Sequence, residues 1–151
     1  MKILALDTAT EACSAALWLD GEVIERYAYA PREHNQLILP MLNGLLADAG
    51  VTLAGLDALA FGRGPGSFTG VRIATGVVQG IAYAASLPVA PVSTLAAMAL
   101  EAIGETGDEF AMPCIDARMG VVYWSVYRRA GDGASTASSA MRSTAPSPAR
   151  R

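Results

Sequence analysis

The chain is predicted to be an α/β protein with a mixed sheet and helices on its faces. Three observations lead to this class. Short, continuous apolar runs are typical of buried strands, longer stretches repeat apolar residues at helical spacing, and the two kinds of segment alternate after the first three strands. The predicted order is therefore β-β-β-α-β-α-β-α, with the start of a second, truncated lobe after it.

The first three segments are predicted to form a meander of strands. Residues 3–6 are a continuous apolar run, residues 13–19 form a second strand, and residues 23–29 form a third. The dipeptide Asp20-Gly21 between the second and third runs is a strong hairpin signal.

Two long helices are predicted, over residues 37–49 and 71–87. The first has an apolar stripe two residues wide, and we expect Pro40 to bend its first turns and Gly50 to end it. The second is apolar nearly all round, which favours burial on more than one side. The alternative is that one face packs on the sheet and the remaining alanines are exposed.

A glycine-rich loop lies between a predicted strand at 56–61 and the second helix. The loop does not match the phosphate-binding P-loop, because that motif needs a lysine and Lys2 is the only lysine in the chain. Its glycine spacing does not match the dinucleotide-binding fingerprint either. The spacing favours a tight turn capped by Ser67 or Thr69 over an anion site at the helix start. The loop residues singled out are Gly62, Gly64, Gly66, Ser67, Thr69, Gly70 and Arg72.

The remaining segments suggest a division of the chain. Residues 88–92 are predicted to form a strand, and Ser93 is predicted to cap a helix that runs to about residue 102. Two further strands, 111–115 and 121–127, form a hairpin. The predicted parts are a lobe of residues 1–103, a linker of residues 104–110, a partial second lobe of residues 111–128 and a tail of residues 129–151.

The tail from Arg129 to Arg151 contains no Leu, Ile, Val or aromatic residue, which predicts disorder. Its four arginines and one aspartate give +3, so that with a total of −3 the first 128 residues carry −6. A basic RNA-binding arm is a weaker interpretation than a coil without function. A further hypothesis is that the tail is an out-of-frame end of a longer gene.

Composition limits the function classes. A net charge of −3 gives no general attraction to nucleic acid. His34 is the only histidine, so a metal site built from paired histidines is excluded, and we assign no catalytic residue and no metal ligand. Both cysteines are expected to be reduced, the longest apolar run is too interrupted to span a bilayer, and we expect a cytoplasmic protein that makes no membrane contact.

Four ordered motifs, at residues 3–14, 31–34, 62–73 and 116–120, resemble those of the TsaB (YeaZ) family. The resemblance covers about residues 1–128. It implies an actin-like (ribonuclease H-like) lobe, related to actin-like ATPases and glycoprotease-like proteins. It also implies a non-catalytic subunit that binds and activates TsaD, which forms the threonylcarbamoyl group on tRNA adenosine next to the anticodon.

The resemblance further implies which subunit of the complex performs which step. TsaD would hold the metal and the transfer site, TsaE would be the ATPase, tRNA would be reached only through the complex, and this chain would hold no cofactor. The interface with TsaD would resemble a helical bundle, and a homodimer through the same helices is an alternative. The partner-binding residues expected are Leu37, Met41, Leu42, Leu45, Ile73, Val77, Gly80 and Ile81.

Two enzyme alternatives are less well supported by the residues. In an actin-like nucleotide-binding phosphotransferase, glycine normally lies two residues after this aspartate, Asp7, so that the phosphate can approach closely. In this sequence the position is Ala9. A glycoprotease would need a metal or a catalytic triad, and the sequence offers no histidine pair and no nucleophile with a base.

Overall fold

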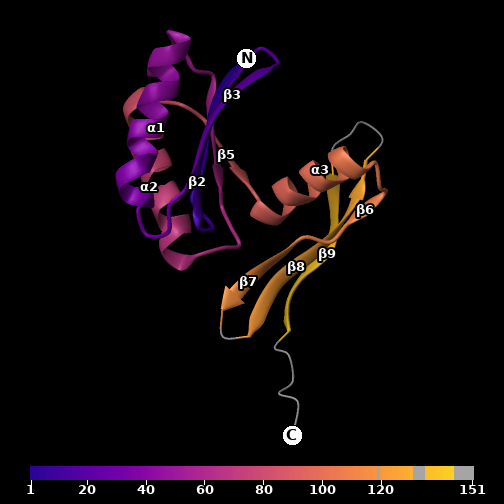
Figure 1. Ribbon diagram of the computed structural model, residues 1–151. Coiled ribbons are helices and arrows are strands. Elements are labelled where there is room, and N and C mark those ends of the chain that lie inside the picture. The colour runs from indigo at the N-terminus through magenta and orange to yellow at the C-terminus, as the bar shows by residue number, and fades with distance from the viewer. Residues whose placement is uncertain (119, 131–134, 145–151) are drawn as a thin grey trace, which may run out of the picture. The chain divides into compact units, whose positions relative to one another are not determined.

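The computed structural model describes residues 1–118, 120–130 and 135–144 (Figure 1). It contains two compact units, Met1–Val92 and Ser93–Arg151. The boundary predicted after residue 103 is wrong, because it falls inside the helix Thr94–Thr106, which packs on the strands of the second unit. The predicted linker at 104–110 is also wrong in part, since this helix continues to Thr106.

The first unit is built on a mixed five-stranded sheet of order β3-β2-β1-β4-β5. β1 pairs antiparallel with β2 and parallel with β4, which confirms the predicted mixed α/β fold. β2 and β3 form the predicted hairpin, with Leu19 opposite Glu22. The strands are β1 (Lys2–Asp7), β2 (Ala12–Leu19), β3 (Glu22–Tyr29), β4 (Ala58–Gly62) and β5 (Val89–Val92).

Two helices, α1 (His34–Ala49) and α2 (Phe68–Ala85), pack on one face of this sheet. Each begins three residues before its predicted start, so the last part of the predicted glycine loop is helical. Gly50 ends α1 in the left-handed conformation, as its position predicts. A short 3-10 helix, Leu53–Gly55, precedes β4.

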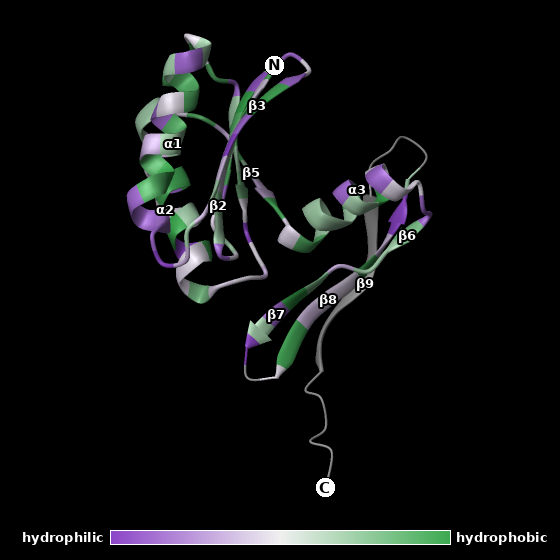
Figure 2. Cartoon of the chain, viewed as in Figure 1, coloured by the Kyte–Doolittle hydropathy of each residue, from purple (hydrophilic) through white to green (hydrophobic). Residues whose placement is uncertain are grey.

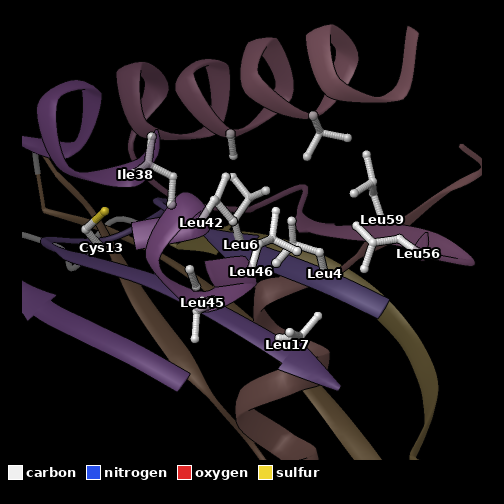
Figure 3. Packing of buried hydrophobic residues seen from close by; sticks show 13 residues of the cluster. Leu4, Leu6, Cys13, Leu17, Ile38, Leu42, Leu45, Leu46, Leu56 and Leu59 are labelled. Atoms are coloured by element: carbon white, nitrogen blue, oxygen red, sulfur yellow. The ribbon is translucent and has the colours of Figure 1, made fainter. Parts of the chain in front are cut away.

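The core of the first unit lies between α1, α2 and the sheet (Figure 3). The alternating residues of the strands that face the helices are buried, as are the residues of the helices that face the strands. Burying each large aliphatic side chain contributes roughly 1.5 to 3 kcal/mol. The buried cluster is Leu4, Leu6, Cys13, Ala15, Leu17, Ile38, Leu42, Leu45, Leu46, Leu56, Leu59, Ala74 and Val78.

The second unit has a four-stranded sheet in which β8 (Val121–Arg129) pairs with each of the other three strands. β6 (Phe110–Ala111) and β7 (Cys114–Arg118) pair antiparallel with it, so the predicted hairpin is present. The helix α3 (Thr94–Thr106) covers β8 through a small cluster of Leu95, Ala99 and Tyr127.

The tail was expected to be disordered, and for residues 135–144 this expectation is wrong. They form β9 (Ser135–Thr144), antiparallel to β8. Strand pairing uses main-chain N–H and C=O groups, which every non-proline residue has, so a segment without large apolar residues can still extend a sheet. The expectation for residues 131–134 and 145–151 falls outside the described residues.

Within the described part of the chain, no helix is both long and apolar enough to cross a bilayer.

Candidate functional site

The glycine-rich loop packs against the turn that follows β1. The hydroxyl of Thr8 donates a hydrogen bond of 2.7 Å to the carbonyl oxygen of Gly70, and the N–H of Ser67 donates one of 2.6 Å to the carbonyl oxygen of Ala9. Thr8 and Ala9 are both buried. The loop and the turn therefore lock together, although they are about 60 residues apart in the sequence.

The glycines are required because this turn comes so close. A Cβ atom at Gly66 would lie 2.3 Å from the carbonyl oxygen of Ala9, and one at Gly70 would lie 1.9 Å from that of Thr8. Backbone atoms cannot move aside as the end of a flexible side chain can. The space that these two glycines leave open is therefore filled by the protein's own chain.

The start of α2 explains the polar residues of the loop. Of the two caps expected, Ser67 is the N-cap, and its hydroxyl accepts a hydrogen bond of 3.4 Å from the N–H of Gly70. Thr69, Gly70 and Arg72 lie within the first turns of the helix. Gly64 has a φ of 86°, a conformation that glycine adopts without strain.

Asp7 is the last residue of β1 and lies against Gly62 of the loop, and His34 is the first residue of α1. Burial raises the pKa of Asp7, while a hydrogen bond of 2.6 Å from the N–H of Ala9 and the charge of His34 lower it. Gly62 leaves room for the carboxylate, because a Cβ there would lie 1.8 Å from its Oδ2. His34 is buried, and its Nε2 has no hydrogen-bond partner in the described structure.

These ionisable groups do not assemble a metal site. Among the described residues, no group of three or more His, Cys, Asp or Glu side chains could hold a metal ion. The buried Cys13 thiol has its pKa raised by burial and by the charge of Asp7, which is unfavourable for a reactive thiolate.

The second candidate site is the side of α2 that faces away from the sheet. Gly70, Ala74 and Val78 are buried at four-residue spacing against the core. The opposite side is exposed, with Phe68 at 73% and Tyr83 at 91%. This outward stripe of α2 consists of Phe68, Thr69, Arg72, Gly76, Gln79, Gly80 and Tyr83.

The helix α1 contributes a matching stripe, because it contacts α2 and packs on the same core. Its exposed residues that point away from the sheet are Gln36, Leu39, Pro40, Asn43 and Ala47. We call the two stripes together the outward surface. Arg72 is the one charged side chain in it. The hydrophobic colour along both helices in Figure 2 includes the residues that each helix buries in the core.

The outward surface differs from the partner-binding set expected from the sequence. Leu42 and Leu45 are 2% and 0% exposed and belong to the core, so their expected role at an interface is wrong. The stripe of α1 that was expected to meet a partner is the one that meets the sheet.

The other expected residues vary in exposure. Gly80 is exposed, and a Cβ there would meet no atom within 4 Å. Five residues are partly buried and pack against the core: Leu37, Met41, Ile73, Val77 and Ile81.

Sequence reasoning missed Phe68, Gln79 and Tyr83 as surface residues, and assigned Arg72 to the loop. The helical period could have found them. At about 100° per residue, these positions lie opposite Ala74 and Val78 on the helix.

Comparison with known proteins agrees with the fold. The family model of TsaD, tRNA N6-adenosine threonylcarbamoyltransferase, matches residues 26–147. The tRNA threonylcarbamoyladenosine biosynthesis protein TsaB of Escherichia coli is 54% identical over 133 residues, which are 88% of this chain and 58% of that protein. TsaB of Haemophilus influenzae is 52% identical over 83% of this chain and 53% of its own length.

A solved structure shows the same likeness. YeaZ from Pseudomonas aeruginosa matches with a TM-score of 0.91 and 48% identity, over 99% of this chain and 70% of that one. The fold and these matches define an α/β protein with an actin-like, TsaD-like domain. The chain belongs to the TsaB (YeaZ) family. It spans a little over half the length of the Escherichia coli and Haemophilus influenzae relatives.

Proposed function

We propose that this chain is a non-catalytic subunit that binds and activates a TsaD-type transferase during formation of threonylcarbamoyladenosine next to the anticodon of tRNA. The partner holds the metal and the transfer site, a TsaE-type ATPase uses ATP, and tRNA is reached through the complex. The observation that carries the proposal is the outward surface of α1 and α2, which combines high exposure with almost no charge.

The composition of this surface is that of an interface core. Interface cores are depleted in charge and enriched in aromatic residues and arginine. Phe68 and Tyr83 mark the two ends of the α2 stripe, and each can bury roughly 150 to 250 Å² against a partner. Between them, Gly76 and Gly80 face open space, so the backbone of a partner helix can approach closely.

The glycine loop supports the non-catalytic part of the proposal. The turn at Thr8 and Ala9 fills the space that Gly66 and Gly70 open, and Ser67 and Thr8 make hydrogen bonds within this contact. A loop used to hold two parts of the fold together is not available to cradle phosphates. We therefore expect titration of the purified chain with ATP to give no measurable heat of binding.

The test of partner binding is co-purification with the TsaD protein of the same organism. Gly80→Arg places a long, charged side chain in the middle of the outward surface and is expected to abolish the complex. The matched control is Gly104→Arg, at an exposed helical glycine of α3 that also faces open space, and it is expected to bind normally. Both variants should melt within a few degrees of the wild type.

Two results would contradict the proposal. One is that Gly80→Arg binds TsaD as tightly as the wild type does. The other is that the wild-type chain forms only a homodimer that TsaD does not displace, measured by size-exclusion chromatography with light scattering.

A further inference from the structure

Phe68 and Arg72 form a preset cation–aromatic pair on the outward surface. Phe68 is the first residue of α2 and Arg72 lies one turn later. The central carbon of the guanidinium lies 3.3 Å from the centre of the phenyl ring, and one guanidinium N–H donates a hydrogen bond of 3.3 Å to the carbonyl oxygen of Phe68. The pair is exposed rather than packed in the core.

We propose that this pair recognises a carboxylate of the protein partner. The inference rests on the proposed function and adds the chemistry of the group that the partner presents. The guanidinium makes one hydrogen bond within the described structure, which leaves most of its five N–H donors available. A carboxylate can accept two of them in parallel.

Burial of Arg72 makes such an acceptor necessary. A partner that covers α2 from Phe68 to Tyr83 removes Arg72 from water, and a buried cation without an opposite charge is strongly unfavourable. The stacking and the hydrogen bond already hold the side chain in place, so that less rotamer freedom is lost on binding. A fixed arginine in a charge-poor interface has the character of a binding hot spot.

The same pair discriminates between partners. A second copy of this chain presents the same outward surface, in which the other polar side chains are neutral amides and hydroxyls and none is a carboxylate. Self-association through this surface leaves Arg72 without a countercharge, whereas a partner with Asp or Glu at the facing position satisfies it. The preference for a different chain over a second copy therefore depends on Arg72.

Affinity for purified TsaD of the same organism, measured by isothermal titration at low and high salt, tests the inference. Arg72→Gln is expected to weaken binding more than about tenfold and to reduce its salt dependence. Arg72→Lys keeps the charge but loses the planar fork, and should restore only part of the affinity. The matched control is Arg63→Gln, an exposed loop arginine outside both helices, with affinity expected within about twofold of wild type.

Sedimentation of the free variants provides a second measurement. Arg72→Gln is expected to self-associate more strongly than the wild type, because the unpaired cation is gone. The melting temperature of each variant checks that the fold is retained.

The outcomes separate this inference from the proposed function. If Gly80→Arg abolishes the complex but Arg72→Gln binds TsaD within twofold of wild type, the carboxylate inference is wrong and the proposed function stands. If neither change affects binding, both are wrong. If Arg72→Gln weakens binding to free tRNA but not to TsaD, the pair recognises a phosphate and the inference is overturned.

Discussion

The guanidinium of Arg129, at the end of β8, donates a hydrogen bond of 2.7 Å to the carbonyl oxygen of Ile103 near the end of α3. It also donates to the carbonyl oxygen of Asp108, and the N–H of Arg129 donates to that of Glu109. The carbonyl oxygen of Ile103 also accepts a hydrogen bond of 3.0 Å from the N–H of Gly107, which ends α3. The side chain of Arg129 thus adds a second hydrogen bond at this end of α3 and fixes the connection from α3 to β6.

Arg129→Ala is expected to lower the free energy of unfolding by about 1 to 2 kcal/mol, because charge-assisted hydrogen bonds to main-chain carbonyls are lost. The neighbouring Arg128→Ala is the control. Arg128 makes an exposed ion pair with Glu109, worth about 0 to 1 kcal/mol. Urea denaturation of both variants measures the difference, and equal losses would show that the contact with Ile103 is unimportant.

Gly70→Ala is expected to destabilise the protein by about 1 to 3 kcal/mol, because the new methyl group would overlap the carbonyl oxygen of Thr8. Gly76→Ala, in the same helix, faces open space and should stabilise by about 0.5 to 1 kcal/mol. Thermal unfolding of the pair measures both effects. A Gly70→Ala protein as stable as the wild type would show that the close approach of the Thr8 turn does not require glycine at this position.

Asp7→Asn is expected to stabilise the protein at neutral pH. Because burial raises the folded-state pKa of Asp7 above 3.8, the folded state binds more protons, and stability is lost as the pH rises through that raised pKa. Asparagine has the same shape, can still accept the hydrogen bond from Ala9, and carries no charge.

The gain from Asp7→Asn should therefore be present at pH 7 and shrink towards pH 3.5, as measured by melting temperature at both pH values. Glu22→Gln, at an exposed side chain of β3, serves as the control and should change neither melting temperature. Loss of stability at pH 7 in the Asp7→Asn protein would mean that the carboxylate makes a net favourable contribution to the fold.

Leu45→Ala and Leu39→Ala should have opposite consequences, although both are in α1. Leu45 is fully buried, so its truncation should cost about 2 to 5 kcal/mol of stability. Leu39 is 48% exposed on the outward surface, so its truncation should change stability by no more than about 0.5 kcal/mol and weaken binding to TsaD. Denaturation and binding measured on the same samples distinguish the two roles, and equal effects on stability would contradict the orientation of α1.

Local signals predicted most of the elements. The apolar run at residues 3–6, the hairpin at Asp20-Gly21 and the stop at Gly50 all appear at or near the expected positions. Helix starts were less accurate. Ser67 and Thr69 are both residue types that cap helices, and the structure has Ser67 as the cap of α2.

The tail shows a limit of composition. Residues 135–144 read as a coil because they lack large apolar side chains, yet they pair with β8. Pairing depends on an open strand edge contributed by a distant segment, and composition does not report whether such an edge exists. The boundary after Val92 was missed for the same reason, since α3 joins the second unit through contacts with Tyr127.

The sequence by itself determined the class of fold, the family, and the absence of a P-loop lysine or a histidine pair, because these follow from residue types and short spacings. Only the tertiary structure decided which side of each helix meets the sheet, and hence that Leu42 and Leu45 are core while Arg72 and Tyr83 are surface. Only the tertiary structure showed that Gly66 and Gly70 of the loop pack directly against the main chain of Thr8 and Ala9. Both facts depend on packing between segments far apart in the chain, and no local pattern encodes which distant segments will meet.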